Sequence, residues 1–475
     1  MLINCIFKKN ILKKRATLFL LSPYILMSIC LASLVFSTHL WASYNQTVIG
    51  PAWGDHDGWD QPEYYSTIRY PDLNGDGKAD ICGREGRGIL CYLRRVDAFV
   101  PSTFFLGLSN AEGWNQPEYY STIRYPEING DGKADICARS KTGVKCYLNT
   151  GKTFVESTFF LGWSDDKGWH IPTYHATIRY PDLNGDGKAD ICGRLKTGVK
   201  CYLNTGTSFT DSNYTVADWS DANSWNHHQY YATIHYPDLN GDNKADVCGR
   251  SRRGIECRLN VGSRFSSSHY LGPDWADAVA WDQRQYYLSI QYPDINSDGK
   301  ADICGRSGSG VVCHLSLEDS FSSVSYRGPE WTDADGWDKP GHYSTIGYSP
   351  VIGENLDICS RTNTGIKCYK NYVKYADMVE YLIDGEEPIY HHPHGEEHEE
   401  RIPLKEKSSI RKCIFSNCIV GLTLTGPEWS DANGWNKPEY YSTIRYPMLD
   451  RNKNVSGICG RSSHGIKCYY RGANL

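Results

Sequence analysis

Residues 64–84 read Tyr64-Tyr-Ser-Thr-Ile-Arg-Tyr-Pro-Asp-Leu-Asn-Gly-Asp-Gly-Lys-Ala-Asp-Ile-Cys-Gly-Arg84, and related stretches recur six more times along the 475-residue chain. Each copy follows a tryptophan, and these tryptophans are spaced by 55 or 56 residues except before the last copy. They are Trp59, Trp114, Trp169, Trp225, Trp281, Trp337 and Trp435. A unit of this length cannot bury its own faces, whereas stacked copies can. The repeat therefore decides the fold.

Each copy predicts four short strands. In the first copy, residues 64–70 are expected to form the innermost strand, because Thr and Ile suit a pleated surface. Residues 79–84 and 88–93 are expected to form a hairpin, and 102–106 a weaker outer strand. Seven such units predict an all-β fold, a seven-bladed β-propeller of four-stranded blades over residues 43–475. Residues 45–49 are expected to complete the last blade and so close the ring.

Fourteen of the eighteen cysteines form seven pairs, with eight residues between partners. A turn centred between them places each pair directly opposite across a hairpin, within reach of a disulfide. Zinc is the alternative, but the spacing is not that of zinc knuckles and histidine is absent from the pattern. The predicted disulfides join Cys82 and Cys91, Cys137 and Cys146, Cys192 and Cys201, Cys248 and Cys257, Cys304 and Cys313, Cys359 and Cys368, Cys459 and Cys468, and separately Cys413 and Cys418. Disulfides require an oxidising compartment.

Two segments lie outside the repeat. Residues 1–42 contain basic residues, then an apolar run and small residues near Ala42, which predicts a secretory signal with an uncleaved membrane anchor as the alternative. Residues 371–423 form an insertion with a His/Glu-rich tract, interpreted as a solvated excursion rather than a transition-metal site. The net charge is −5 and the basic residues are scattered, so the sequence shows no basic patch of the kind that binds nucleic acid.

The loop after the first predicted strand carries oxygen donors in a fixed pattern. Positions 1, 3, 5 and 9 are Asp, Asn, Asp and Asp in the first copy, and the Lys at position 7 offers a backbone carbonyl. Hard oxygen donors at this spacing predict a Ca²⁺ site. The alternative is that Asp, Asn and Gly only form turns, which would explain one copy of the pattern but explains five copies poorly. The predicted ligands are Asp72, Asn74, Asp76, Lys78, Asp80, Glu127, Asn129, Asp131, Lys133, Asp135, Asp182, Asn184, Asp186, Lys188, Asp190, Asp238, Asn240, Asp242, Lys244, Asp246, Asp294, Asn296, Asp298, Lys300 and Asp302. The sixth and seventh copies have lost this pattern.

These D-x-N-x-D-G-x-x-D loops, at the spacing of propeller blades, resemble the FG-GAP/VCBS repeat family. The resemblance implies an integrin-α-like propeller with about five calcium ions. Related architectures include integrin-like lectins, whose sugar pockets lie between neighbouring blades. The family has many functions, so the fold alone selects none of them.

An arginine follows the first cysteine of every copy by two residues, and an Asp follows the first tryptophan of six loops by two, while the second copy has Asn110 at this position. One interpretation is a structural contact between blades, and the other is a polar clamp for a ligand beside an aromatic face. The candidate ligand-binding residues are Trp59, Trp114, Trp169, Trp225, Trp281, Trp337, Trp435, Arg84, Arg139 and Arg194.

The sequence favours an exported calcium-binding protein for recognition or adhesion, with glycans as the expected ligands. A scaffold that binds cell-surface proteins is the first alternative, and a polysaccharide-active enzyme on a propeller is the second. No H-E-x-x-H or G-x-S-x-G motif occurs, and no Glu recurs as an acid/base partner, so no catalytic residue is predicted.

Overall fold

The computed structural model describes residues 46–95, 98–350, 356–371, 420–425, 427–450 and 455–470, all within the unit Ser43–Leu475. The predicted signal of residues 1–42, nearly all of the insertion at 371–423 and the predicted pairing of Cys413 with Cys418 lie outside the described residues. Among the described residues, no helix is long and apolar enough to cross a membrane.

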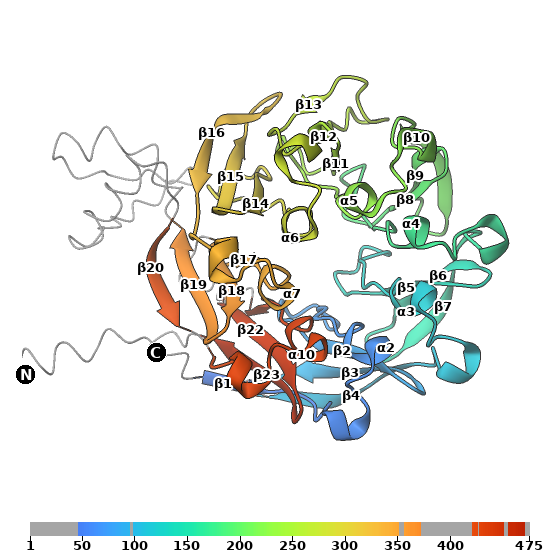
Figure 1. The fold of residues 1–475 in the computed structure, drawn as a ribbon. Helices are drawn as coiled ribbons and strands as arrows, with labels where there is room; N and C mark the ends of the chain where they lie inside the picture. The colour runs from blue at the N-terminus through green and yellow to red at the C-terminus, as the bar shows by residue number, and fades with distance from the viewer. Residues whose placement is uncertain are drawn as a thin grey trace, which may run out of the picture. The chain divides into compact units, whose positions relative to one another are not determined.

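The described residues form seven antiparallel sheets that follow one another in chain order (Figure 1). The first three contain β2 (Ile81–Glu85), β3 (Gly88–Arg94) and β4 (Phe99–Leu106); β5 (Ile136–Ser140), β6 (Gly143–Asn149) and β7 (Phe154–Leu161); and β8 (Ile191–Leu195), β9 (Gly198–Asn204) and β10 (Phe209–Val216). The fourth and fifth contain β11 (Val247–Ser251), β12 (Gly254–Arg258) and β13 (Tyr270–Leu271), then β14 (Ile303–Ser307), β15 (Gly310–Ser316) and β16 (Phe321–Arg327). The sixth contains β17 (Gly347–Ser349), β18 (Asp357–Thr362), β19 (Gly365–Asn371) and β20 (Val420–Thr425). The seventh contains β21 (Met448–Asp450), β22 (Val455–Ser462), β23 (Gly465–Tyr470) and β1 (Gln46–Ile49). Repeated small sheets of this kind make an all-β, propeller-like fold.

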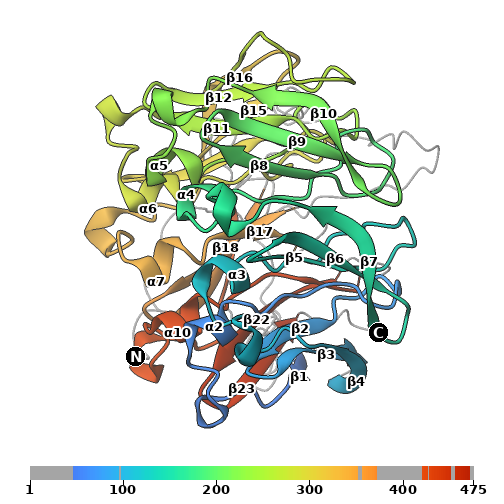
Figure 2. The same cartoon turned by 90° about the vertical axis from the view of Figure 1, so that its right-hand side faces the viewer.

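The predicted innermost strand is corrected by the structure. Pro62–Tyr65 forms a one-turn helix, α2, because proline at the first helical position has a φ suited to the helix and needs no hydrogen-bond donor there. Only Arg69 of the predicted strand pairs with the sheet, through a single bridge to Cys82. The equivalent helices are α3 (Pro117–Tyr120), α4 (Pro172–His175), α5 (His228–Tyr231), α6 (Arg284–Tyr287), α7 (Pro340–Tyr343) and α10 (Pro438–Tyr441). Figure 2 shows these helices together on one side of the sheets.

Short 3₁₀ helices precede the one-turn helices and carry the Asp or Asn that was singled out in the sequence. They are η1 (Asp55–Asp57), η2 (Asn110–Glu112), η3 (Asp165–Lys167), η4 (Asp221–Asn223), η5 (Asp277–Val279), η6 (Asp333–Asp335) and η8 (Asp431–Asn433). Each ends at a residue in the left-handed conformation, such as Gly168 with φ of 88°.

The predicted hairpin register is confirmed. Cys192 and Cys201 are directly opposite on β8 and β9, and they form a disulfide. The same cross-strand pairing joins Cys82 and Cys91, Cys137 and Cys146, Cys248 and Cys257, Cys304 and Cys313, Cys359 and Cys368, and Cys459 and Cys468. All fourteen of these cysteines are buried.

The N-terminal strand closes the fold as predicted. β1 pairs antiparallel with β23, and Val48 lies opposite Cys468. The hydroxyl of Tyr440 in the seventh copy also donates to the Asp55 carboxylate in the first copy, at 2.5 Å. Figure 1 shows β1 beside β23, so the first and last parts of the repeat region meet.

Candidate functional site

The third Asp loop represents the five predicted calcium loops. The carboxylate of Asp182 accepts hydrogen bonds from the amides of Gly185 and Gly187, at 2.7 and 2.8 Å. The carboxylate of Asp186 accepts from the amide of Lys188 at 2.9 Å. Gly185 and Gly187 both have positive φ, which lets the chain turn tightly enough to present these amides.

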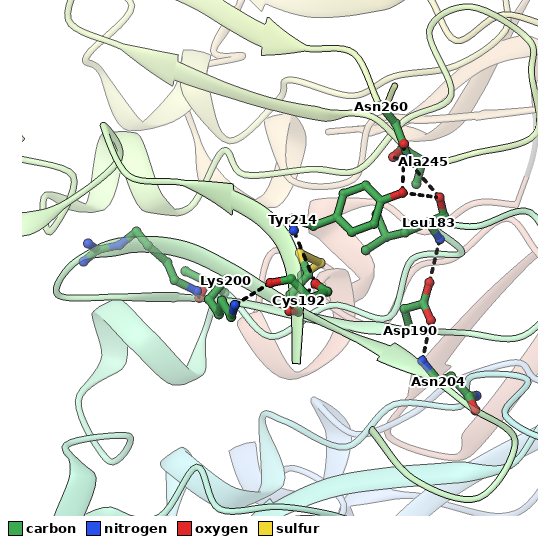
Figure 3. Close-up of a disulfide and its surroundings, with 12 residues drawn as sticks. Leu183, Asp190, Cys192, Lys200, Asn204, Tyr214, Ala245 and Asn260 are labelled. Atoms are coloured by element: carbon green, nitrogen blue, oxygen red, sulfur yellow. Dashed lines mark hydrogen bonds between the residues drawn. A yellow bond between two sulfur atoms is a disulfide. The ribbon is translucent and has the colours of Figure 1, made fainter. Parts of the chain in front are cut away.

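The last Asp of the loop is buried beneath it. Asp190 is fully shielded from water and accepts hydrogen bonds from the amides of Leu183 and Asn204, at 2.8 and 2.7 Å (Figure 3). Burial raises the pKa of Asp190 to about 6, and the negative charges of Asp182 and Asp186 add to the rise. The equivalent Asp80, Asp135, Asp246 and Asp302 are buried in the same way, with pKa values raised to about 7, 6, 7 and 7.

The donor set of these loops fits a hard cation. Three carboxylates close in sequence repel one another, and a divalent cation relieves that repulsion. In the second loop, one carboxylate oxygen of Glu127 is buried without a hydrogen-bond partner. Against this, no three His, Cys, Asp or Glu side chains in the described parts of the chain are already arranged as a metal site. The Lys188 ammonium lies 3.8 Å from Asp186 and supplies part of the positive charge.

Neighbouring Asp loops are joined by hydrogen bonds. The amide of Ala245 donates to the carbonyl of Asp182 at 2.8 Å, and the side chain of Asn260 donates to the carbonyl of Leu183 at 2.7 Å. Figure 3 shows Asn260 reaching from the fourth sheet to Leu183 in the third loop. These two hydrogen bonds therefore hold the third Asp loop against the fourth copy of the repeat.

The predicted tryptophan platforms are corrected. The seven tryptophans of the candidate set, from Trp59 to Trp435, have exposed fractions of only 1–7 %. Trp169 stacks on Trp163 with ring centroids 4.0 Å apart, and both indoles cover Gly193 of β8. A Cβ at Gly193 would lie 2.6 Å from Trp169, so the position has no room for a side chain. Indole faces covered in this way pack the core, and of the seven tryptophans Trp225 also borders the cavity of the fourth copy.

The arginines of the candidate set are also buried, and the structural interpretation of these residues is confirmed. Arg139 is fully shielded from water and contacts the Asp165 carboxylate at 2.7 Å. The hydroxyl of Tyr119 donates to the same carboxylate at 2.6 Å, and the Arg139 guanidinium lies over the Tyr119 ring, 5.1 Å from its centroid. We call this arrangement the Arg–Tyr–Asp clasp. It joins one copy of the repeat to the next.

The clasp recurs at every junction, with two variations. The arginine contacts are Arg84–Asn110, Arg139–Asp165, Arg194–Asp221, Arg250–Asp277, Arg306–Asp333, Arg361–Asp431 and Arg461–Asp55. The first junction has Asn in place of Asp, and the sixth has His342 in place of the tyrosine. The tyrosines were missed from sequence because residues 64–70 and their equivalents were predicted as strands.

An open cavity of about 670 Å³ lies in the fourth copy. It is bounded by the loop around Trp219–Tyr230 and by the turn that joins β11 to β12. Its polar lining includes Asn223, His227, Arg252, Arg253, Glu256 and His269. The Glu256 carboxylate accepts from Ser251 at 2.7 Å, and His227 stacks on the Tyr230 ring with an interplanar angle of 10°.

The residues that line this cavity depart from the repeat. The Arg252-Arg253 turn replaces Lys196-Thr197 of the third copy, and Glu256 replaces Lys200. These departures from the repeat are the sequence signal for the cavity. The residues that all copies share do not reveal it. Neither Arg252 nor Arg253 has a side-chain partner among the described residues, and both are exposed.

Comparison with known proteins shows the fold. No protein-family model matches the sequence, and no curated protein sequence matches it. The resemblance to FG-GAP/VCBS repeats therefore remains a resemblance. Among solved structures, the chain is similar to an Agrocybe aegerita lectin that recognises non-reducing terminal N-acetylglucosamine, with 22 % identity, a TM-score of 0.55 and coverage of 65 % of this chain and 77 % of the lectin.

Two further structures are more distant. A Photorhabdus luminescens Tc holotoxin pore has 14 % identity and a TM-score of 0.40, over 69 % of this chain and 14 % of that chain. The extracellular domain of BT4673 from B. thetaiotaomicron has 11 % identity and a TM-score of 0.36, over 90 % of this chain and 40 % of that chain. Of the three, only the lectin exceeds 0.5, and at its low identity it establishes a shared propeller-like fold and nothing about the ligand.

Proposed function

We propose that this chain is an exported, calcium-binding, seven-bladed β-propeller with four-stranded blades, which recognises glycans and is not an enzyme. The observation that carries the proposal is the polar cavity of the fourth copy, on a fold shared with a lectin. Seven buried disulfides support export, because such bonds persist in oxidising compartments.

The cavity has the chemistry that a sugar requires. Its volume of about 670 Å³ is in the range of small-ligand sites. The Glu256 carboxylate accepts hydrogen bonds from hydroxyls, while Asn223 and the two free arginines donate them. The Tyr230 and His227 rings supply an aromatic edge for the less polar face of a sugar ring. Of the tryptophans predicted to contact the ligand, Trp225 borders this cavity, whereas Trp169 and the other five are not among its lining residues.

Calcium has a supporting role in this proposal. The five Asp loops hold the ion through the predicted oxygen donors, and the ion supplies the positive charge that offsets their clustered carboxylates. Because neighbouring loops are hydrogen-bonded, the ion stabilises the contact between sheets rather than touching the sugar.

The test is a binding titration with N-acetylglucosamine-terminated oligosaccharides, preceded by a glycan array, in calcium-containing buffer. Arg253→Ala is expected to weaken binding by about tenfold, because a charged hydrogen bond is lost. Arg87→Ala is the matched control, since Arg87 occupies the equivalent turn of the first copy and pairs with Glu85 outside the cavity. Equal binding by both variants, or no glycan bound on the array, would refute the proposal.

A further inference from the structure

The innermost edge of the sheets carries a set of basic side chains that the proposed function does not use. The residue after the Ile of each Ile-x-Tyr-Pro stretch makes the single bridge to the first cysteine of its sheet. We call the four arginines at this position the inner arginines: Arg69, Arg124, Arg179 and Arg445. His235 and Gln291 make the same bridge in the fourth and fifth sheets.

Each inner arginine is held in the same way. Nη1 of Arg124 donates to the carbonyls of Ser121 and Ile123, both at 2.8 Å. Arg69, Arg179 and Arg445 make the equivalent pairs of bonds. Their Nε and Nη2 atoms make no hydrogen bond within the described ranges, and no described carboxylate pairs with any of the four. Each guanidinium therefore keeps free N–H donors and an unneutralised charge.

The inner positions of neighbouring copies lie side by side: the His235 ring is 5.6 Å from the Tyr292 ring, and the Gln291 side chain donates to the carbonyl of Ile346 at 2.7 Å. Burial, together with the positive charges of Arg179 and Arg445, lowers the pKa of Arg124 to about 10. Burial also lowers the pKa of Arg69, as do the charges of Arg124, Arg445 and Arg179. The inner arginines belong to the seventh, first, second and third copies, which follow one another because β1 pairs with β23, so their charges lie along one continuous inner edge although they are far apart in sequence.

Tyrosine hydroxyls surround the same position. In six of the seven copies the tyrosine that follows the inner position is partly buried, and its Oη is buried without a hydrogen-bond partner among the described residues. These are Tyr70, Tyr125, Tyr180, Tyr236, Tyr292 and Tyr348. A tyrosine hydroxyl is an O–H donor, so each of these phenols can donate a hydrogen bond to an acceptor oxygen.

The seventh tyrosine, Tyr446, is placed differently, because the preceding copy has glycine at the inner position. Gly347 occupies the inner position of the sixth copy, and the ring of Tyr446 fills the space, 2.3 Å from where a Cβ would lie. The Tyr446 hydroxyl donates to the carbonyl of Thr345 at 2.9 Å. Tyr446 thus differs from the other six tyrosines, whose hydroxyls have no partner among the described residues.

We propose that the inner arginines and their neighbouring tyrosines bind a multivalent oxyanion, an inorganic sulfate or phosphate or the sulfate or phosphate group of a larger ligand. Four like charges along one inner edge repel one another, and an oxyanion neutralises them while accepting hydrogen bonds from the free guanidinium N–H groups. Guanidinium groups match the geometry of sulfate and phosphate oxygens better than an ammonium does. The inference does not depend on glycan recognition in the fourth copy.

The experiment titrates sulfate into the full chain and follows both calorimetric binding and the melting temperature, with sodium chloride at equal ionic strength as the reference. The test variant is Arg124→Gln, because Gln291 shows that this fold accommodates glutamine at the inner position. The control is Arg87→Gln, on an exposed turn. A second arm replaces inorganic sulfate by a sulfated monosaccharide. Tighter binding of the sugar sulfate assigns the oxyanion to a larger ligand, and tighter binding of the free ion assigns it to a small solute.

The expected result is sulfate binding by the unmodified chain and by Arg87→Gln, weakened about tenfold in Arg124→Gln. Without sulfate, Arg124→Gln is expected to melt no lower than the unmodified chain, because it removes a like-charge repulsion. Sulfate stabilises many proteins by exclusion from their surfaces. An equal rise in melting temperature for all three proteins, or no calorimetric binding, therefore overturns the proposal.

Discussion

Nη1 of Arg139 lies 2.7 Å from Oδ1 of Asp165, although the two residues belong to successive copies of the repeat. Arg139 is fully shielded from water, and Asp165 is its carboxylate partner. Burial raises the pKa of Asp165, but hydrogen bonds from Tyr119 and Arg139 outweigh it, so the net pKa is lowered. The contacts between the two copies thus favour the charged form of the Asp165 carboxylate.

Asp165→Ala is expected to destabilise the fold by about 1.5–3 kcal/mol, because it leaves a buried guanidinium without its carboxylate. Asp165→Asn is the control. It reproduces Asn110 of the first junction, which keeps a hydrogen bond to Arg84, and should cost less. Chemical denaturation of the two variants measures the difference. Equal stability of Asp165→Ala and the unmodified protein would show that the clasp contributes nothing.

Trp169→Ala is expected to destabilise the protein by about 3–5 kcal/mol, because it removes a buried indole from a stacked pair. Glycan binding per folded molecule should remain, since Trp169 is not among the residues that line the cavity of the fourth copy. Thermal melting and a binding titration of the folded fraction separate the two effects. A stable variant that has lost binding would restore the tryptophan as a ligand contact.

Removal of calcium is expected to lower the melting temperature, because the ion binds only the folded Asp loops. Sites of the extracellular kind bind with dissociation constants of about 10⁻⁴–10⁻³ M, so millimolar calcium should restore the original value. Asp186→Ala should reduce the number of bound ions by one, measured by calorimetry. An unchanged melting temperature in excess chelator would count against calcium in these loops.

Replacing Cys137 and Cys146 together by serine is expected to cost about 2–3 kcal/mol, because a short loop of the unfolded chain is no longer constrained. The double variant avoids a free thiol, which would complicate the measurement. Peptide mapping without reduction checks the pairing first, and denaturation then gives the stability. Detection of a Cys137 peptide joined to any cysteine other than Cys146 would contradict the register.

Acidification is expected to destabilise the protein through His235. Burial lowers the pKa of His235 to about 4, and the nearby Arg179 charge adds to the shift. The unfolded chain, with a His pKa near 6.5, binds more protons than the folded chain between these values. The contribution of neutral His235 to the free energy of unfolding is therefore fully present above about pH 6.5 and is lost as the pH falls toward 4.

The variant for this test is His235→Gln, which reproduces the residue at the equivalent position of the fifth copy. It should flatten the loss of stability between pH 6.5 and pH 4 without changing stability at pH 8. Denaturation at a series of pH values measures both quantities. The same slope in the variant and the unmodified protein would assign the acid sensitivity to other groups.

The sequence by itself determined the features that depend on neighbouring residues and on repetition. Cys192 and Cys201 face each other because a hairpin turn lies midway between them, which is a local relationship. Residues 46–49 pair with β23 because the repeat itself showed which strand the last copy lacked. The clustered oxygen donors of the Asp loops likewise form a local pattern.

Tertiary structure decided the features that depend on what covers a residue. Tyr64 to Tyr70 have strand-like residues, yet the helical turn begun by Pro62 and the contact of Tyr64 with Asn110 draw them away from the sheet. Trp169 looks the same in sequence whether its indole faces water or Trp163, and only packing covers it. Arg124 and Arg445 are 321 positions apart, and they approach only because successive sheets bring their inner edges together. Burial and convergence of this kind arise from the whole ring, so no single copy of the repeat contains them.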